Sequence, residues 1–279
     1  MRILVTGANG YLGQGIVSKL CDMGIEVVAT DICGDNIDSR ANTVTCDLFG
    51  VEDVKKVFGE IDVVLHLAWR DGFIHNSTRH IEDLPCHYSL LCKLIDAGAK
   101  KVCVMGTMHE IGFFEGSIDE NTPCNPQNNY GIAKDALRKF VKHLCKTKGV
   151  DFQWLRGYYI VGNSKFGSSI FSKITAAESD GKELFPFTTG QNQYDFLDYI
   201  DFCKQVALAV SQDKVNGIIN ICSGKPEKLC DRVERFIKEN NYKIKLEYGK
   251  FPDREYDSKA IWGNNKKIQE ILNDAQLKI

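Results

Sequence analysis

Tyr130 and Lys134 stand four residues apart in the segment Tyr130-Gly131-Ile132-Ala133-Lys134. Apolar residues recur after it at helical spacing, so the segment is predicted to be helical and both side chains share one face. A free tyrosine titrates near pH 10, and a neighbouring ammonium favours its phenolate and lowers its pKa. Such a phenol can give a proton to a carbonyl oxygen, or take one from an alcohol, while hydride is transferred. By itself, the same pair is also typical of a solvated helix face.

A glycine-rich loop, Gly7-Ala8-Asn9-Gly10-Tyr11-Leu12-Gly13, follows an apolar run and opens a helical stretch. Glycine permits a tight turn and lets the backbone approach a pyrophosphate, whose charge meets unpaired N–H groups at a helix N-terminus. The alternative is an ordinary glycine-rich turn, but a strand before it and a helix after it favour a dinucleotide site. The hydride would then pass to or from a nicotinamide.

Asp31 lies 18 residues after Gly13, at the end of the second expected strand. A carboxylate there binds a ribose 2′-hydroxyl and repels a 2′-phosphate, which favours NAD(H). The alternative is a turn aspartate. Arg40 could serve a 2′-phosphate if its loop folds back, so NADP(H) stays open.

Thr107 follows the fifth expected strand, in Met105-Gly106-Thr107-Met108-His109. Its hydroxyl is the candidate third group that holds the reacting oxygen beside Tyr130. The alternative is a threonine that only caps the strand end.

Short apolar runs alternate with helical periodicity up to about residue 160, which predicts a parallel sheet covered on both faces. The fold class is therefore α/β, a Rossmann-type doubly wound sheet. The expected strands are Arg2–Val5, Glu26–Thr30, Thr43–Cys46, Asp62–Leu67, Lys101–Met105 and Asp151–Leu155. The expected helices between them are Leu12–Met23, Val51–Phe58, Leu84–Ala97 and Asn128–Thr147.

The last third of the chain breaks this rhythm. Residues 1–162 are assigned to a dinucleotide-binding domain and residues 163–279 mainly to a small substrate-binding lobe over the carboxyl ends of the strands, with 195–223 returning to the sheet. Within the lobe we expect helices at Ser168–Ser179 and Leu229–Asn240 and a strand at Lys243–Tyr248.

Composition narrows the class of protein. The net charge of −2 gives no electrostatic reason for a nucleic-acid partner, and no apolar run is long enough for a membrane. The eleven cysteines are scattered without a Cys-x-x-Cys pair, which predicts reduced thiols in a cytoplasmic protein without a metal site.

Together, these segments resemble the extended short-chain dehydrogenase/reductase family, in its NAD-dependent epimerase/dehydratase branch. The match includes the glycine loop, His66-Leu67-Ala68, the Tyr130/Lys134 pair, Asp195–Asp201 and Asn220–Gly224. The resemblance implies a nucleotide-sugar substrate and a homodimer formed through Leu84–Ala97 and Asn128–Thr147. Leu90, Leu91, Leu94 and Ile95 allow such a contact, but packing against the sheet alone would also use them.

The resemblance also assigns roles to single residues. The catalytic group is Thr107, Tyr130 and Lys134. The cofactor-binding set is Gly7, Asn9, Gly10, Tyr11, Leu12, Gly13, Asp31, Asp47, Leu48, Leu67, Ala68 and Lys134. The substrate-binding set is Trp69, Arg70, Met108, His109, Tyr130 and Arg254, of which Arg254 has the alternative of a surface arginine.

Departures from the family pattern limit the reaction. The 4,6-dehydratases carry Asp-Glu after the catalytic threonine, where this chain has Met108-His109 with Glu110 one place late, so water loss is not expected. A 4-reductase of a nucleotide-linked 4-keto-6-deoxyhexose, or the reverse dehydrogenase, ranks first. A 4-epimerase with tightly bound NAD comes second. A non-catalytic cofactor sensor comes last, because both Tyr130 and Lys134 are present.

Overall fold

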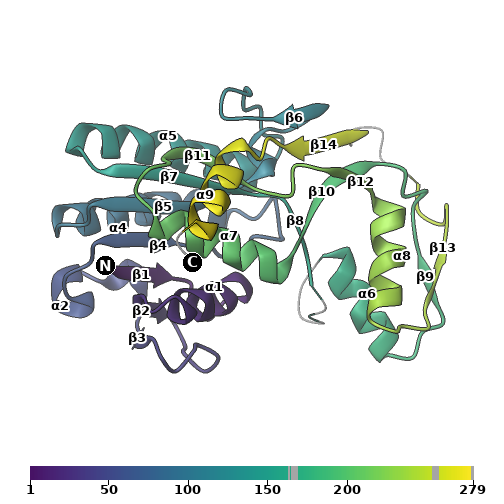
Figure 1. Cartoon of the computed structure of the whole chain (residues 1–279), viewed down its shortest axis with the longest axis horizontal. Coiled ribbons are helices and arrows are strands. Elements are labelled where there is room, and N and C mark those ends of the chain that lie inside the picture. The colour runs from purple at the N-terminus through teal and green to yellow at the C-terminus, as the bar shows by residue number, and fades with distance from the viewer. Residues whose placement is uncertain (163, 165–168, 253–257, 278–279) are drawn as a thin grey trace.

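The computed structural model describes residues 1–162, 164, 169–252 and 258–277. Its largest layer is a seven-stranded parallel sheet with the order β11-β7-β5-β4-β1-β2-β3 (Figure 1). The strands are β1 (Arg2–Thr6), β2 (Glu26–Asp31), β3 (Asn42–Thr45), β4 (Val63–His66), β5 (Lys101–Thr107), β7 (Asp151–Gly157) and β11 (Gly217–Ile221). This order, with crossover helices between the strands, confirms the expected doubly wound α/β fold.

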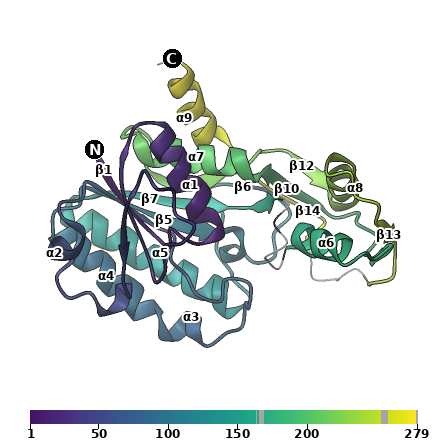
Figure 2. The ribbon, with the colours of Figure 1, turned by 90° about the horizontal axis from the view of Figure 1, so that it is seen from below.

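Helices cover both faces of this sheet (Figure 2). One face carries α1 (Tyr11–Asp22), α7 (Tyr199–Ser211) and α9 (Lys266–Gln276), and the other carries α2 (Val54–Phe58), α4 (Leu84–Asp96) and α5 (Asn129–Lys148). Successive strand residues alternate between the two cores: Ile3 and Val5 pack in the first, Leu4 in the second. Burial on both faces explains why these strands read as continuous apolar runs.

A smaller part lies beyond the carboxyl ends of the seven strands (Figure 1). Its five-stranded sheet is built from β6 (Gly116–Ile118), β8 (Tyr159–Val161), β10 (Gln193–Asp198), β12 (Pro226–Lys228) and β14 (Ala260–Gly263). A two-stranded sheet of β9 (Leu184–Pro186) and β13 (Lys245–Glu247) accompanies α6 (Ile170–Ser179) and α8 (Leu229–Glu239).

Segment 195–223 divides between the two parts. Its helix α7 and strand β11 belong to the seven-stranded layer, whereas β10 pairs with β8, β12 and β14 in the smaller sheet. Asp195 joins the parts at this point, because its buried carboxylate accepts hydrogen bonds from the backbone N–H groups of Ser223, Gly224 and Gly263. Burial raises the pKa of Asp195, and these donors oppose that effect.

The expected dimer residues on α4 are not available to a partner. Leu90, Leu91, Leu94 and Ile95 are at most 7% exposed, because they pack against the sheet of their own chain. The exposed apolar residues of α5 are Ile132 and Phe140, and Phe140 contacts Tyr88 of α4 with ring centroids 5.7 Å apart.

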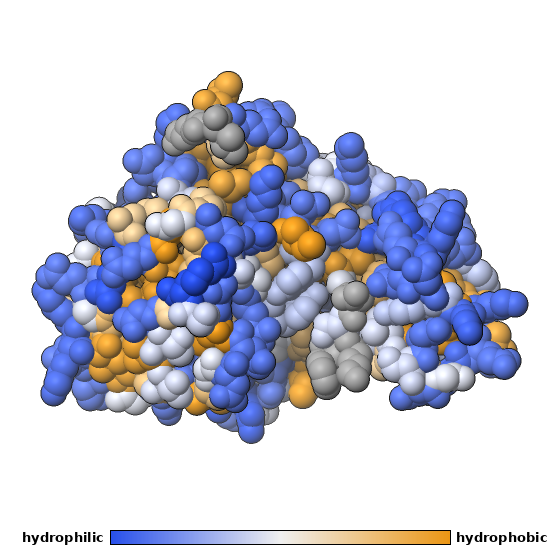
Figure 3. Space-filling view, turned by 60° about the horizontal axis from the view of Figure 1, so that its bottom comes forward, coloured by the Kyte–Doolittle hydropathy of each residue, from blue (hydrophilic) through white to orange (hydrophobic). Residues whose placement is uncertain are grey.

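The surface in Figure 3 is covered mostly by charged and polar side chains, with apolar ones in separate patches. Among the described residues, no helix is both long and apolar enough to cross a membrane.

Candidate active site

The glycine loop packs so closely that side chains are excluded from it. Gly7 has a φ of +69°, and a Cβ added there would lie 2.7 Å from the backbone nitrogen of Ala68. A Cβ at Gly13 would lie 2.6 Å from the carbonyl oxygen of Ala8. Helix α1 begins after Gly10, and no described side chain caps it. Its first N–H groups therefore point at the space above β1, which fits a pyrophosphate.

Asp31 lies beside this loop at the end of β2. Its carboxylate accepts hydrogen bonds from the backbone N–H groups of Asn9, at 3.0 Å, and Ile32, at 2.8 Å. Arg40 does not approach it, because the Arg40 guanidinium is held by Asp38 at 2.7 Å and Asp22 at 3.0 Å. The positive charge that could have served a 2′-phosphate is thus already paired, and the loop does not fold back as NADP(H) would have required.

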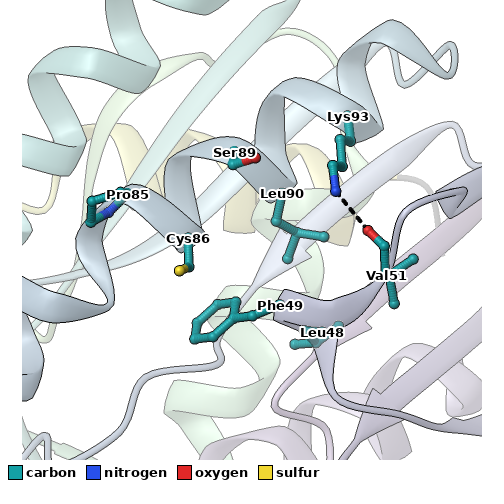
Figure 4. Close-up of a pocket in the computed structure, with 8 residues that line it drawn as sticks. All are labelled: Leu48, Phe49, Val51, Pro85, Cys86, Ser89, Leu90 and Lys93. Carbon is teal, nitrogen blue, oxygen red and sulfur yellow. Dashed lines mark hydrogen bonds between the residues drawn. The ribbon is translucent and has the colours of Figure 1, made fainter.

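A cavity of about 240 Å³ lies at Leu48, one of the predicted cofactor-binding residues, directly after Asp47 (Figure 4). Asp47 caps a 3-10 turn, η1 (Leu48–Gly50), by accepting the N–H of Phe49 at 3.1 Å. The cavity is lined by Leu48, Phe49 and Val51 on the η1 side and by Pro85, Cys86, Ser89, Leu90 and Lys93 of α4. Lys93 fixes the wall by donating to the carbonyl of Val51 at 2.8 Å.

Tyr130 and Lys134 project from the first turns of α5. Asn128 caps this helix by accepting the N–H of Gly131 at 2.8 Å. A Cβ at Gly131 would lie 2.5 Å from the carbonyl oxygen of His109. Glycine therefore lets α5 approach the segment after β5, and this approach brings Tyr130 beside Thr107.

The Thr107 hydroxyl hydrogen-bonds the Tyr130 side chain, and Lys134 Nζ donates to the carbonyl of Met105 at 2.8 Å. The structure thus brings the three predicted catalytic residues together at the end of β5.

The expected lowering of the Tyr130 pKa is not found. Burial raises the pKa of Tyr130 to about 12, and the hydrogen bond from Thr107 only partly opposes this. Burial also lowers the pKa of Lys134 to about 7, so this side chain is not the fully charged ammonium that the argument from spacing assumed. The burial of both groups, which helical spacing does not reveal, decides the direction of the two shifts.

The predicted substrate residues separate into different surroundings. Trp69 lies over Lys134, with Nζ 3.8 Å from the ring centroid, and His109 lies 6.0 Å from Tyr130 between ring centroids. Burial lowers the pKa of His109 to about 4, so it is neutral at pH 7. Arg70 turns instead to Asp83 and makes two hydrogen bonds with it, at 2.8 and 2.5 Å.

The other two predicted substrate residues contribute less. The side chain of Met108 is buried in the apolar cluster of the smaller part, because it packs with Ile118 and Phe171. Arg254 lies outside the described residues.

Two histidines beside Tyr130 were not predicted. The ring of His75 stacks on Tyr130 at 5.6 Å with an interplanar angle of 10°, and its carbonyl accepts the Tyr130 N–H at 2.9 Å. His80 lies 5.4 Å from Tyr130 between ring centroids and accepts the Trp69 indole N–H at 3.0 Å. Four of the six histidines of the chain fall between residues 66 and 87, a density that could have marked this segment.

The other two histidines of that segment form a buried pair. His66 shares hydrogen bonds with Thr6 Oγ1 at 2.8 Å and with His87 Nδ1 at 2.9 Å. His87 in turn stacks on Trp69 at 4.5 Å with an angle of 6°. Burial is the largest cause that lowers the pKa of both imidazoles, to about 3 for His87. The pair fixes the ends of β1 and β4 against α4.

Comparison with known proteins identifies this arrangement. A model of the NAD dependent epimerase/dehydratase family matches residues 3–222. The chain belongs to this family. A dTDP-6-deoxy-L-talose 4-dehydrogenase (NAD(+)) from Aggregatibacter actinomycetemcomitans is 43% identical over 94% of this chain and 99% of that protein. A putative UDP-glucose 4-epimerase from Methanocaldococcus jannaschii is 25% identical over 96% of this chain and 92% of its own.

Solved structures of this epimerase/dehydratase family share the fold. The UDP-glucose 4-epimerase of Thermotoga maritima, solved with UDP-glucose, matches with a TM-score of 0.81 at 22% identity, over 97% of this chain and 92% of that one. Membership in the family confirms the resemblance seen in the sequence, the assignment as an enzyme and NAD(H) as the cofactor. Among the described residues, no three His, Cys, Asp or Glu side chains are grouped to hold a metal ion.

Proposed function

We propose that this family member transfers hydride at C4 of a dTDP-linked 6-deoxyhexose, as a 4-keto reductase with NADH and as a 4-dehydrogenase with NAD⁺. The observation that supports this proposal is that Thr107, Tyr130 and Lys134 come together at the end of β5, on the edge of the sheet that also carries the glycine loop. The choice of sugar rests on the relative named dTDP-6-deoxy-L-talose 4-dehydrogenase (NAD(+)), which is similar over almost its full length.

The cofactor-binding residues fit NAD(H). Gly7, Gly10 and Gly13 leave the backbone open to a pyrophosphate, and Asp31 offers a carboxylate to a ribose. Asp47 and Leu48 would meet the adenine ring, which the cavity at Leu48 supports, and the backbone of Leu67 and Ala68 lies against Gly7.

The chain's own residues handle the proton. When bound, NADH would supply the hydride that reduces the C4 ketone to an alcohol, with NAD⁺ as the other product. Tyr130 gives the proton that the C4 oxygen takes, because a phenol with a pKa of about 12 is protonated at neutral pH. Thr107 holds that oxygen through its hydroxyl. Lys134, with a pKa of about 7, then supplies the proton that restores the Tyr130 phenol. Oxidation runs the same steps backward and needs the phenolate.

The direct test is an assay of the purified chain with dTDP-6-deoxy-L-talose and NAD⁺, and with the corresponding 4-keto sugar and NADH. We expect NADH to form in the first reaction and to be consumed in the second, with the C4 product identified by NMR. A panel of UDP- and GDP-linked sugars serves as the comparison. No change in NADH with any dTDP-linked 6-deoxyhexose would contradict the proposal.

A 4-epimerase is the second candidate, because a putative UDP-glucose 4-epimerase is similar over 96% of this chain. An epimerase returns hydride to the same substrate, so it retains its cofactor and changes no NADH in bulk solution. NAD⁺ that stays bound through gel filtration, together with interconversion of C4 epimers, would favour this activity over the reductase.

The proposal extends to the substrate-binding lobe, the compartment and the oligomeric state. Residues 163–279 supply most of the substrate-binding lobe, and the enzyme works as a cytoplasmic homodimer. The eleven free cysteines support a reducing compartment. Ile132 and Phe140 replace the α4 leucines as the apolar contact between subunits, because both are exposed on α5, where Phe140 lies against the half-buried Tyr88 of α4. Light scattering of Phe140→Glu against the wild type tests this contact.

A further inference from the structure

Glu110 is a fully buried acid that the proposed reaction does not use. Its oxygens accept hydrogen bonds from the Thr107 backbone N–H at 2.7 Å and from the Trp154 indole N–H at 2.8 and 2.9 Å. Arg156 Nη2 lies 3.4 Å from Oε2. Each of these partners donates, and none in the described part of the chain accepts a proton from Glu110. Burial raises the pKa of Glu110, but these donors and the charge of Arg156 oppose that rise, so the hydrogen-bond partners favour the ionised carboxylate.

Holding this charge in the core is costly. The Arg156 side chain is itself 0% exposed, and its Nη1 donates to the carbonyl of Asp119 at 3.2 Å. Arg138 adds a second guanidinium, with Nε 3.7 Å from the Glu110 carboxylate. A buried ion pair seldom stabilises a core more than apolar residues of the same volume would. Stability alone is thus a poor reason for these charges.

The place of Glu110 in the chain points to another reason. It is the third residue of η2 (Met108–Glu110), the 3-10 turn that Thr107 caps. Thr107 Oγ1 accepts the N–H of His109 at 3.3 Å while the Glu110 carboxylate accepts the N–H of Thr107, a reciprocal capping box. Thr107 is therefore held through both its backbone N–H and its hydroxyl.

Gly106 shows how tightly this contact is built. A Cβ at Gly106 would lie 2.7 Å from Glu110 Oε1 and 2.7 Å from Cδ1 of Trp154. The residue before Thr107 is glycine because the carboxylate and the indole fill the space that a side chain would need. Gly106, Glu110 and Trp154 thus form one packed support beneath the end of β5.

We propose that Glu110 is a positioning residue for the C4 hydride transfer, which sets Thr107 against Tyr130 through its buried carboxylate; this inference rests on the proposed function. Glu110, which stands one place later than the Asp-Glu pair of the dehydratases, faces the core and supports the catalytic threonine.

The charge of Glu110 also acts on the groups around it. It faces Arg138, Lys134 and Tyr130 from α5, Arg156 from β7, Tyr158 just beyond β7, and Cys124 from the loop before α5. Glu110 raises the pKa values of Tyr130 and Lys134. A neutral residue at position 110 would lower the pKa values of both Tyr130 and Lys134. The pH dependence of the reaction rate therefore reports on the charge of Glu110 separately from its geometry.

The test compares Glu110→Gln and Glu110→Asp with the wild type in the dTDP-6-deoxy-L-talose assay. Glu110→Gln should lower kcat by about 10- to 100-fold, with KM within about threefold of the wild type. It should also move the rise of the oxidation rate with pH, which follows the Tyr130 phenolate, to lower pH. Glu110→Asp keeps the charge but moves it away from Thr107. We therefore expect kcat to fall while the oxidation rate still rises at the same pH as in the wild type. The exposed acid Glu120, paired with Lys267, supplies the control Glu120→Gln, which should match the wild type.

A purely structural role would lower thermal stability and leave the kcat and pH profile of the folded variants unchanged, and that result would overturn the inference. If both carboxylate variants fail to fold, the folded variant Trp154→Phe provides the test, because it removes the indole N–H donor to Glu110 and keeps an aromatic ring. A reduced kcat then supports the inference and a wild-type kcat refutes it. Absence of turnover in the wild type contradicts the proposed function and this inference with it, whereas turnover unaffected in folded Glu110→Gln contradicts the inference alone.

Discussion

The indole of Trp69 lies over the amine of Lys134, with Nζ 3.8 Å from the ring centroid. The same ring also stacks on His87, with centroids 4.5 Å apart, and its N–H donates to His80 at 3.0 Å. Trp69 thus connects a catalytic side chain to the histidines of segment 66–87, and it stands directly after the His66-Leu67-Ala68 segment that borders the glycine loop.

Replacing Trp69 should affect Lys134 first. In Trp69→Ala the amine loses its aromatic contact and gains water, so we expect kcat to fall about tenfold or more. Trp69→Phe keeps an aromatic face and loses the hydrogen bond to His80, and the loss of that bond should cost about 1 kcal/mol of unfolding free energy. Urea titration and steady-state kinetics on both variants check this. An unchanged kcat in folded Trp69→Ala would show that the contact has no part in the reaction.

The His66–His87 pair predicts loss of stability in acid. The pKa of His87 is lowered from 6.5 to about 3, so between these pH values the unfolded chain binds a proton that the folded chain does not. The free energy of unfolding should therefore fall as the pH drops below about 6.5, with His87 accounting for about 2 kcal/mol between pH 7 and pH 5.

Urea titrations at pH 7 and pH 5 measure this dependence. His87→Asn should remove the His87 share of the pH dependence, whereas His143→Gln, a change on the exposed surface of α5, should leave the dependence intact. Equal pH dependence in His87→Asn and the wild type would mean that His87 is not held neutral in the folded protein.

Asp31 should set the preference for NAD(H). Asp31→Asn keeps the shape and removes the charge that repels a 2′-phosphate, so the ratio of kcat/KM for NAD⁺ to that for NADP⁺ should fall about tenfold. Arg40→Met should leave that ratio unchanged, because the Arg40 guanidinium is already bound by Asp22 and Asp38. A ratio that responds to Arg40 and not to Asp31 would place the ribose elsewhere.

Much of this site could be predicted because its signals are local. Gly7, Gly10 and Gly13 mark a turn, and the four-residue spacing of Tyr130 and Lys134 defines a helix face whatever surrounds it. The strands of the main sheet were predictable for the same reason, since burial on both faces leaves continuous apolar runs. Helix α9, which we did not predict, also carried a local signal, Ile268 and Ile271 three residues apart.

The rest depends on how distant segments meet. His75 and His80 reach Tyr130 only through the path of the loop between β4 and α4. Glu110 looks like a displaced catalytic acid until the 3-10 turn directs it into the core. The three-residue strands β6, β8, β9 and β12 exist because partners far along the chain pair with them, and so short a segment carries too little periodicity to be recognised, whereas β13 falls within the strand expected at Lys243–Tyr248.

The most direct measurement of the central claim is the turnover of Tyr130→Phe with the dTDP-linked 4-keto-6-deoxyhexose and NADH, beside its affinity for NADH. The variant removes only the proton that Tyr130 supplies, so kcat should fall by about 10²- to 10⁴-fold while NADH binds as in the wild type. Near-normal turnover with intact NADH binding would show that another group protonates the C4 oxygen, and would contradict the role of the Thr107, Tyr130 and Lys134 group.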